Sequence, residues 1–415
     1  MTNYNLLHNK RLSVHSLPPY DPLQAFVRDN HIALKGMEEG PLSDLVFAAK
    51  DVFKITGSTW GNGHPEWLST SSPDDFTAST IKNLLESGAD SVGKTVCDEL
   101  CFSISGENWH YGSPLNPHDA RRLTGGSSSG TCAATAGGLV DFAIGSDCLG
   151  SVRVPASYNG LLGMRPTYRR VPTDGEAPYC ESMDVLGFVA NDPTVFKQVA
   201  KELLKEDPEN SSFTKLLIAT DCFNIIDHEV KTSLEKAVQF VGENVGTVEE
   251  VVLAPEGLDE WAKTFRIVQG YEVWQSYGGF INKYQPRLSP GPKERLQWAS
   301  KISLQEYYEA YKKMKEIKEH LEKIISPGDL LILPTVSSIA PLKSAPHDEI
   351  TYLRKQSSEL LCISPLAGIP QVTIPLATQY NMPLGISLIG ANNTDLELAN
   401  FGANLVEKFK NHVAN

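Results

Sequence analysis

Two polar loops of this 415-residue chain contain serines that could act as nucleophiles. The first is the Gly-Gly-Ser-Ser-Ser-Gly run at residues 125–130, and the second contains Ser151, which lies 24 residues after Ser127. A serine hydroxyl is a weak nucleophile and needs a neighbouring base. Lys50 ends the apolar stretch 45–49, and burial of such a lysine lowers its pKa and frees its amine to act as that base. Taken singly, a surface lysine and a flexible or anion-binding glycine loop are the simpler interpretations.

Two shorter motifs point to other serine hydrolases. Residues 126–130 fit G-x-S-x-G with Ser128 as nucleophile, but that motif requires a strand directly before it. The preceding residues 118–124 are too polar to form a buried strand. Ser79 and Lys82 fit the S-x-x-K pattern of penicillin-recognising enzymes, but no K-T-G triplet follows. The sequence therefore favours neither class.

The composition excludes several other functions. There are 37 Lys and Arg residues against 50 Asp and Glu, and the net charge of −13 argues against binding to a nucleic-acid backbone. No apolar run approaches the ~20 residues of a membrane span, and the polar N-terminus does not look like a signal peptide. Cys97 and Cys101 lack a second pair that would complete a zinc site. We therefore expect a cytoplasmic protein with reduced thiols, no metal and no cofactor.

The segments that must position the two serine loops alternate between strands and helices. Apolar stretches at 45–49, 91–96 and 139–144 predict strands, residues 77–86 predict a helix, and the small residues 131–138 predict a closely packed helix. This alternation predicts an α/β fold with a mostly buried sheet. The helix and strand between the two serine loops can return both loops to one edge of that sheet.

Residues 201–325 are more charged and more helical than the rest of the chain. A capping box at Ser303–Glu306 opens an amphipathic helix there. Strand-like sequence returns after Pro327, so we expect the C-terminal strands to rejoin the N-terminal sheet. Because no repeat or linker is visible, residues 1–415 are predicted to form a single domain that includes this variable helical region.

Together these motifs resemble the amidase signature family. That family has, in order, a Lys-Asp pair, a Gly-Gly-Ser-Ser loop, a helix of small residues, the pattern G-(T/S)-D-x-x-G-S-x-R-x-P, and a closing Arg-Pro-Thr. This chain carries them at residues 50–51, 125–130, 131–138, 145–155 and 165–167. The resemblance covers a core of about 41–195 and 325–405. It implies the amidase signature fold, a central mixed sheet covered by helices on both faces.

The resemblance also implies a Ser-Ser-Lys triad. Ser151 would be the nucleophile, Ser127, held by a cis peptide bond, would relay its proton, and neutral Lys50 would be the base. For that role the pKa of Lys50 must fall by a few units from its usual ~10.4. The oxyanion would be held by the backbone N–H groups of the second loop, namely Cys148, Leu149, Gly150 and Ser151. By family position, the substrate site would include Cys101, Ser127 and Ser128.

One residue departs from the family pattern. Most relatives have glycine at the position of Leu149, directly before Gly150. If that position requires a positive φ, Leu149 is strained by roughly 1–3 kcal/mol. We then expect the loop that carries the oxyanion donors to be remodelled.

Within the family, residues 61–67, 102–108 and 111–112 are most similar to plant-type indole-3-acetamide amidohydrolases. This implies hydrolysis of a small neutral amide, aryl acetamides included, with Trp60 and Trp109 flanking a flat substrate. Two alternatives stay open: the glutamine-hydrolysing subunit of an amidotransferase, and a scaffold on an inactive amidase core, although such scaffolds lose triad residues. The expected partner is a small-molecule amide, with no nucleic acid and no membrane, and a homodimer stays open.

Overall fold

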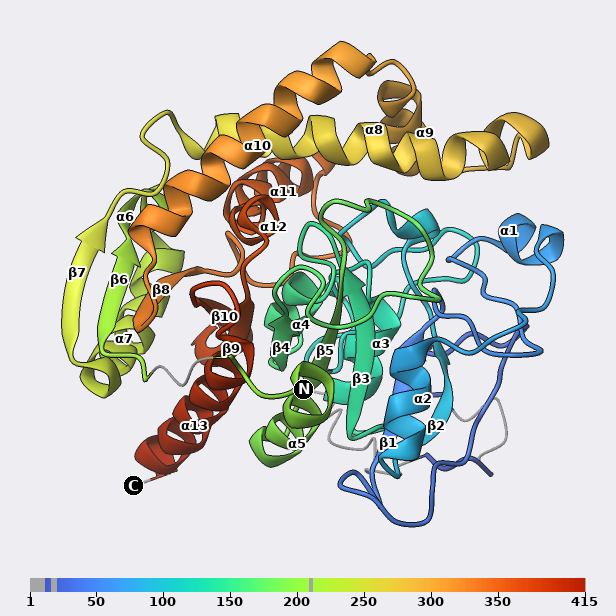
Figure 1. Ribbon diagram of the computed structural model, residues 1–415, viewed down its shortest axis with the longest axis horizontal. Helices are drawn as coiled ribbons and strands as arrows, with labels where there is room; N and C mark the ends of the chain where they lie inside the picture. The colour runs from blue at the N-terminus through green and yellow to red at the C-terminus, as the bar shows by residue number, and fades with distance from the viewer. Residues whose placement is uncertain (1–11, 16–20, 209–211, 415) are drawn as a thin grey trace.

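The computed structural model describes residues 12–15, 21–208 and 212–414, and Figure 1 shows a central sheet flanked by helices. Ten strands form one sheet in the order β2-β1-β3-β5-β4-β9-β10-β8-β6-β7. β1 is parallel to β2 and β3, whereas β10 is antiparallel to β9 and β8, so the sheet is mixed. The strands are β1 Val46–Lys50, β2 Asp90–Thr95, β3 Phe142–Asp147, β4 Leu162–Arg165, β5 Val185–Ala190, β6 Lys215–Ala219, β7 Thr247–Val251, β8 Asp329–Pro334, β9 Gln371–Gln379 and β10 Met382–Ile389.

The helices follow the same numbering as Figure 1. They are α1 Pro65–Thr70, α2 Ser79–Glu86, α3 Ser129–Ala136, α4 Arg153–Tyr158, α5 Pro193–Leu204, α6 Thr220–Asn224, α7 His228–Val245, α8 Leu258–Tyr284, α9 Pro290–Ala299, α10 Leu304–Ile324, α11 His347–Leu361, α12 Ile363–Ala367 and α13 Asp395–Ala414, with a short 3-10 helix at Glu99–Cys101. Within the described ranges, no helix combines the length and the apolarity that crossing a bilayer requires.

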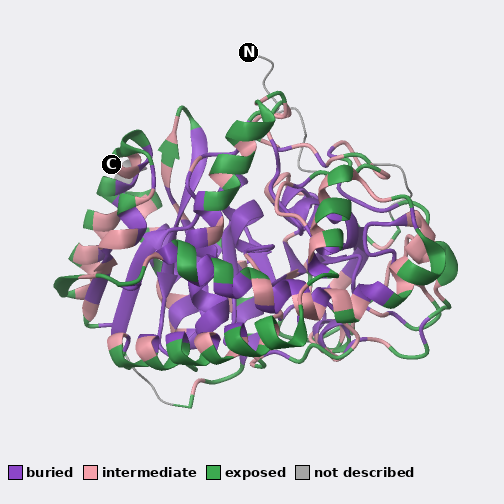
Figure 2. Cartoon of the chain, turned by 90° about the horizontal axis from the view of Figure 1, so that it is seen from above, coloured by how far each residue is buried: buried purple, intermediate pink, exposed green. Residues whose placement is uncertain are grey.

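Helices cover both faces of the sheet, as strand β3 demonstrates. Ala143 packs in one apolar cluster with Ala133 of α3, whereas Phe142 and Ile144 belong to a second cluster that contains Phe196 of α5. Successive residues of a strand point to opposite faces, so α3 and α5 lie on opposite sides of the sheet. Figure 2 shows the strands buried between helices whose outer faces are exposed. The predicted α/β fold with a mixed, mostly buried sheet is confirmed.

The N-terminal elements lie close to their predicted positions. The helix expected at 77–86 begins at Ser79, and the segment of small residues forms α3. The strand expected at 139–144 lies three residues further along, at Phe142–Asp147. Leu139 and Val140 are buried, but they lie in the turn that follows α3, and burial alone made them look like part of the strand.

The region 201–325, predicted to be helical, also contains two strands. β6 pairs in parallel with both β7 and β8, so this region extends the sheet as well as covering it. β7 was not predicted because it is an edge strand whose first four residues are exposed, two of them glutamates. The capping box at the start of α10 is present: Ser303 Oγ accepts from the Glu306 N–H at 3.2 Å, and the Glu306 carboxylate accepts from the Ser303 N–H at 2.8 Å.

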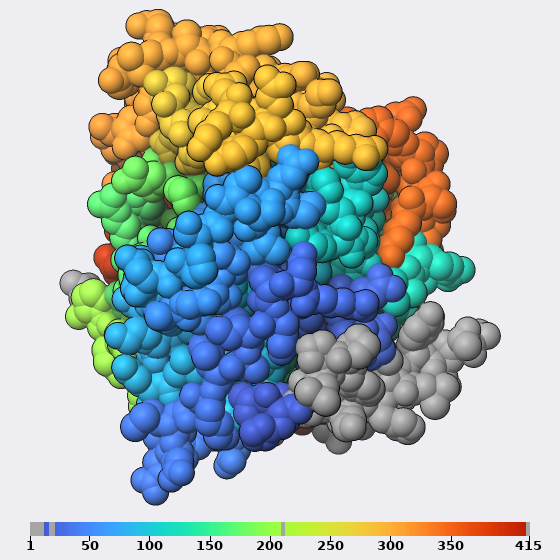
Figure 3. Space-filling view, turned by 90° about the vertical axis from the view of Figure 1, so that its right-hand side faces the viewer, coloured from blue at the N-terminus to red at the C-terminus, as the bar shows by residue number. Residues whose placement is uncertain are grey.

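Helices α8 and α9 lie across the N-terminal part of the chain, as the yellow and blue regions of Figure 3 show. Asn62 Nδ2 donates to the Tyr277 hydroxyl of α8 at 3.0 Å. The Ser289 N–H, just before α9, donates to the Glu99 carboxylate at 2.9 Å. The variable region therefore covers the edge of the sheet where β1 and β3 end.

Candidate active site

Lys50 is the last residue of β1, and it is completely buried. Its Nζ donates to Ser127 Oγ at 2.7 Å and to Ser146 Oγ at 2.8 Å. β1 and β3 are parallel and Ala49 pairs with Ile144, so both strands end at the same edge and Ser146 lies beside Lys50. The sequence analysis brought Lys50 and Ser127 together but missed Ser146. The sequence feature that could have identified Ser146 is its place as the hydroxyl residue at the second position of the Gly145–Ser151 motif.

Ser127 follows a cis peptide bond after Gly126, as the resemblance implied. Glycine is required before it, because a Cβ at Gly126 would lie 2.3 Å from Asp98 Oδ1. The Ser128 N–H donates to the Ser151 carbonyl at 3.0 Å, and this bond ties the two serine loops together. The Ser128 hydroxyl donates to the Ser146 carbonyl at 3.4 Å.

Ser151 and Cys101 line the same pocket. Ser127 and Ser128 are fully buried, and neither is among the residues that line this pocket. Of the three serines, Ser151 is therefore the one whose hydroxyl a ligand in the pocket can contact. In the described part of the chain, no hydrogen bond joins the hydroxyls of Ser127 and Ser151 directly.

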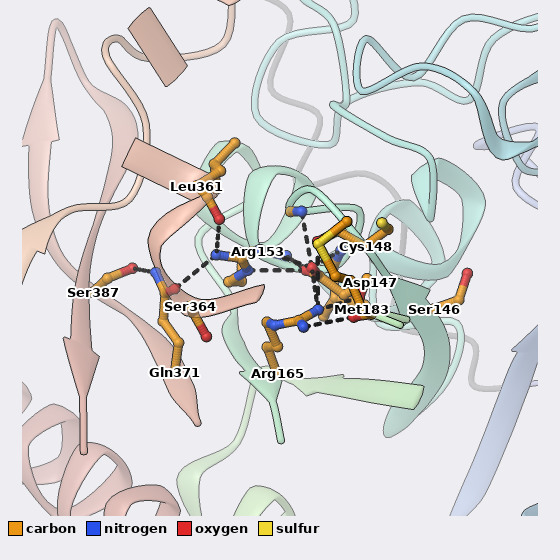
Figure 4. Close-up of polar contacts among 12 residues, drawn as sticks. Ser146, Asp147, Cys148, Arg153, Arg165, Met183, Leu361, Ser364, Gln371 and Ser387 are labelled. Atoms are coloured by element: carbon orange, nitrogen blue, oxygen red, sulfur yellow. Dashed lines mark hydrogen bonds and ion pairs between the residues drawn. The ribbon is translucent and has the colours of Figure 1, made fainter. Parts of the chain in front are cut away.

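The loop that carries Ser151 is held by a buried carboxylate. Asp147 Oδ1 accepts from Arg153 Nη2 at 2.8 Å and from Arg165 Nη1 at 3.2 Å, and its Oδ2 accepts from the Val152 N–H at 3.0 Å (Figure 4). All three charged side chains are completely buried. Burial alone would raise the pKa of Asp147, but the two guanidinium groups hold it well below its ordinary value. This network stabilises the loop shape around Ser151.

One of the four expected oxyanion donors is already engaged. The Gly150 N–H donates to Asp147 Oδ1 at 2.8 Å, so it points into the loop's own carboxylate. The hydrogen bonds described for this loop give no acceptor to the N–H groups of Cys148, Leu149 and Ser151. The expected set of donors is therefore reduced from four to these three.

The expected strain at Leu149 is wrong, because the positive φ lies at its neighbour. Gly150 has a φ of +96°, and Leu149 is not among the residues with a positive φ. A Cβ at Gly150 would lie 2.7 Å from Leu361, so that position requires glycine for space as well. The Leu149 side chain lines the pocket beside Ser151.

Burial and two neighbouring cysteines shift the pKa of Lys50 in opposite directions. Burial alone would raise the pKa of Cys101, but a hydrogen bond with Cys97 and the positive charge of Lys50 lower it to about 6. Burial lowers the pKa of Lys50, but interactions with Cys101 and Cys97 outweigh burial, and the pKa of Lys50 is raised above its ordinary value. The prediction that burial lowers the pKa of Lys50 is therefore wrong when Cys101 is ionised.

The aromatic residues of the pocket are not the expected ones. Trp60 is buried against Trp67, and Trp109 is 52 % exposed beneath the Arg287 guanidinium. Phe102, Tyr179 and Trp298 line the pocket instead. Trp298 belongs to the variable region, where the resemblance offered no guidance.

A group of three residues with metal-ligating side chains lies beside this site. His64, Glu99 and His110 come within 4.8 Å of one another, which their spacing in sequence did not predict. The His64 ring accepts from the Glu66 N–H at 3.1 Å and lies 3.3 Å from the Arg287 carbonyl oxygen. Glu99 bonds to His110 at 2.7 Å through one oxygen and to Ser289 through the other. These three residues therefore have hydrogen-bond partners, and their bonds connect the N-terminal segment to the variable region.

Comparison with known proteins gives consistent results. The sequence profile described as "Amidase" matches residues 6–252. The chain is similar to Amidase 1 of Arabidopsis thaliana, with 33 % identity over 403 residues that cover 89 % of this chain and 95 % of that protein. It is also similar to the chloroplastic Outer envelope protein 64 of the same plant, with 31 % identity covering 86 % of this chain and 65 % of that protein. A crystal structure of an amidase superposes with a TM-score of 0.80 at 25 % identity, covering 89 % of this chain and 85 % of that one.

Proposed function

This chain belongs to the amidase signature family and is an amidase, and we propose that it hydrolyses its amide with a triad of Ser151, Ser127 and Lys50. The observation that carries the proposal is the 2.7 Å hydrogen bond from Lys50 Nζ to Ser127 Oγ, between residues 77 positions apart. The hydrogen bond from Ser128 to the Ser151 carbonyl supports it, because this bond holds the nucleophile loop against the relay serine.

In this mechanism, neutral Lys50 accepts a proton from Ser127 while Ser127 accepts the proton of Ser151. The Ser151 oxygen attacks the amide carbonyl, and the carbon–nitrogen bond breaks as the relay returns the proton to the departing ammonia or amine. Water then attacks the ester on Ser151, and the same groups carry its proton. The carboxylic acid is released and the free serine is restored.

The negative charge on the attacked oxygen is stabilised by the backbone donors of the second loop. We assign this role to the N–H groups of Cys148, Leu149 and Ser151, because the Gly150 N–H is bonded to Asp147. Such donors act before the reaction begins, since the loop is already fixed, and loss of one costs on the order of 10² to 10³ in rate.

The two alternatives receive less support. A scaffold on an inactive core has no need of an intact triad, whereas Lys50, Ser127 and Ser151 are all present and two of them are hydrogen-bonded. Glutamine carries an ammonium group that calls for a carboxylate partner, and no aspartate or glutamate is among the residues that line the described pocket. We further propose one domain in the cytoplasm, with a small-molecule amide as partner, and a homodimer stays a prediction.

The proposal is tested by ammonia release from a panel of amides. Ser151→Ala should abolish release, and Ser127→Ala and Lys50→Ala should each lower kcat by several orders of magnitude. The matched control is Lys82→Ala, which removes an exposed lysine of α2 and also tests the S-x-x-K alternative. Full activity of Ser151→Ala, or loss of activity in Lys82→Ala alone, would contradict the triad.

A further inference from the structure

Three arginines line the pocket that contains Ser151. They are Arg266 of α8, Arg295 of α9 and Arg354 of α11. All three come from parts of the chain outside the motifs that form the triad. No aspartate or glutamate lines the described pocket, so the three guanidinium groups face no carboxylate there.

These guanidinium groups have no ionic partner among the described residues. In those ranges, the arginines that form ion pairs are others, namely Arg121, Arg122, Arg153, Arg165 and Arg170. Arg295 Nε is buried without a hydrogen-bond acceptor. A buried donor of this kind normally has a partner, because without one the free energy lost on removing it from water is not recovered. The missing partner is an acceptor that the described part of the protein does not supply.

The three charges also lie close enough to oppose one another. Burial lowers the pKa of Arg295 to about 10, and the charge of Arg354 adds to the effect. Desolvation by the surrounding pocket and the charge of Arg266 lower the pKa of Arg354 in the same way. A cluster of like charges is unfavourable in the free protein and favourable once an anion lies among them.

Aromatic rings hold two of these arginines in place. The Arg266 guanidinium lies 5.0 Å from the centroid of Trp298, and the Arg295 guanidinium lies 5.5 Å from the centroid of Phe102. Stacking on an aromatic face fixes a planar guanidinium while leaving its N–H edge free to donate. The cluster is therefore arranged before a ligand arrives.

We propose that Arg266, Arg295 and Arg354 bind a carboxylate of the substrate, so that the enzyme hydrolyses a monoamide of a dicarboxylic acid, with the amide at Ser151 and the far carboxylate at the arginines. This inference rests on the proposed amide hydrolysis and replaces the neutral amide that the sequence indicated. Guanidinium groups bind carboxylates through paired, charge-assisted hydrogen bonds. The absence of an acidic residue from the described pocket lining distinguishes this substrate class from α-amino acid amides, whose ammonium group the cluster would repel.

The experiment compares substrates that differ only in charge. kcat/KM is measured for a series of dicarboxylic acid monoamides of increasing chain length, for the methyl ester of each, and for a neutral aryl acetamide. Each charge-assisted hydrogen bond is worth about 1.5–3 kcal/mol, so one member of the acid series should exceed its ester by roughly tenfold to hundredfold. The preferred chain length then reports the distance from Ser151 to the cluster.

Variants separate the cluster from general effects on the enzyme. Arg354→Met should lower kcat/KM for the acid roughly tenfold or more, mainly through KM, and leave the ester unchanged or improved. Arg295→Met should do the same, and Arg295→Lys should retain part of the preference because it keeps the charge. Arg121→Met, an exposed arginine that does not line the pocket, is the control. Arg354 is exposed, so its replacement tests the idea even if Arg295→Met fails to fold.

The outcomes distinguish this inference from the function on which it rests. Equal kcat/KM for acids and esters, with Ser151-dependent hydrolysis of both, would overturn the carboxylate site and leave the amidase mechanism standing. A preference for the acid that persists in both Arg354→Met and Arg295→Met would also overturn it. Failure to hydrolyse any amide, with Ser151 unreactive, would instead contradict the proposed triad.

Discussion

Lys50 Nζ lies 2.7 Å from Ser127 Oγ, and both side chains are completely buried. The two residues come from different parts of the fold, the end of β1 and the loop before α3. Ser146 takes a second hydrogen bond from the same Nζ at 2.8 Å. Two hydroxyl oxygens therefore hold the amine in place, and its ability to act as the proposed base depends on how easily it loses a proton.

The proton affinity of Lys50 predicts the pH dependence of the reaction. Lys50 must be neutral to accept a proton, so kcat/KM should rise with pH through its pKa. The charge of Cys101 raises that pKa, whereas burial lowers it. In Cys101→Ser the charge is gone and burial remains, so the rise should move to lower pH. The measurement is the pH profile of kcat/KM for both proteins.

Cys222→Ser is the control for this shift. Cys222 is also completely buried, but it lies in α6, and burial raises its pKa well above the usual value, so it carries no charge in the neutral range. Its replacement should leave the profile where it is. An identical profile for Cys101→Ser and the wild type would show that Cys101 does not control Lys50.

Ser146 offers a test of how the lysine is positioned. Ser146→Ala removes one of the two acceptors of Lys50 Nζ and leaves the bond to Ser127 in place. We expect kcat to fall about tenfold, because the loss of a charge-assisted hydrogen bond costs about 1.5 kcal/mol or more, with KM little changed. Ser146→Thr keeps the hydroxyl and should recover part of the rate. Steady-state kinetics that give full kcat in Ser146→Ala would contradict this positioning role.

Leu149 should set the size of acyl group that the pocket accepts. Its side chain lines the pocket next to Ser151, and its backbone does not have the positive φ that would favour glycine. Leu149→Gly should therefore shift kcat/KM toward bulkier acyl amides. A side chain of this size is worth about 1.5–3 kcal/mol, so the shift could reach tenfold or more. Paired assays on a small and a bulky amide measure it, and an unchanged ratio with unchanged rates would show that Leu149 does not limit the pocket.

Asp147 should contribute strongly to stability. Asp147→Asn leaves the charges of Arg153 and Arg165 buried without their carboxylate, and such a change costs about 3–5 kcal/mol. Urea unfolding should show a large drop in the midpoint. Asp119→Asn is the matched control, because the Arg121 partner of Asp119 is 82 % exposed and the midpoint should barely move. Equal midpoints for the two variants would contradict a structural role for the buried network.

The residues of the proposed triad could be identified from sequence because they lie in contiguous motifs. Lys50, Ser127 and Ser151 each end or follow a recognisable strand or glycine-rich loop, and the resemblance supplied their order. The raised pKa of Lys50 could not be predicted, because it depends on a cysteine that the fold brings from another loop. The hydrogen bond from the Gly150 N–H to Asp147 could not be predicted either, because it depends on the path of the folded loop.

The arginine cluster escaped the sequence analysis for a different reason. Its members are 29 and 59 residues apart, on three helices whose surfaces read as ordinary charged faces. Only the packing of α8, α9 and α11 over the sheet edge brings them to one pocket. The edge strand β7 was missed on similar grounds, since an exposed strand with two glutamates lacks the apolar pattern of a buried one.

Covalent labelling with a fluorophosphonate tests directly whether Ser151 is the nucleophile. The wild-type enzyme is treated with a fluorophosphonate, digested, and the modified peptide is located by mass spectrometry, with Ser151→Ala and Ser128→Ala treated in parallel. We expect one adduct on Ser151, present in Ser128→Ala and absent from Ser151→Ala. An adduct on Ser128 that persists in Ser151→Ala would contradict it.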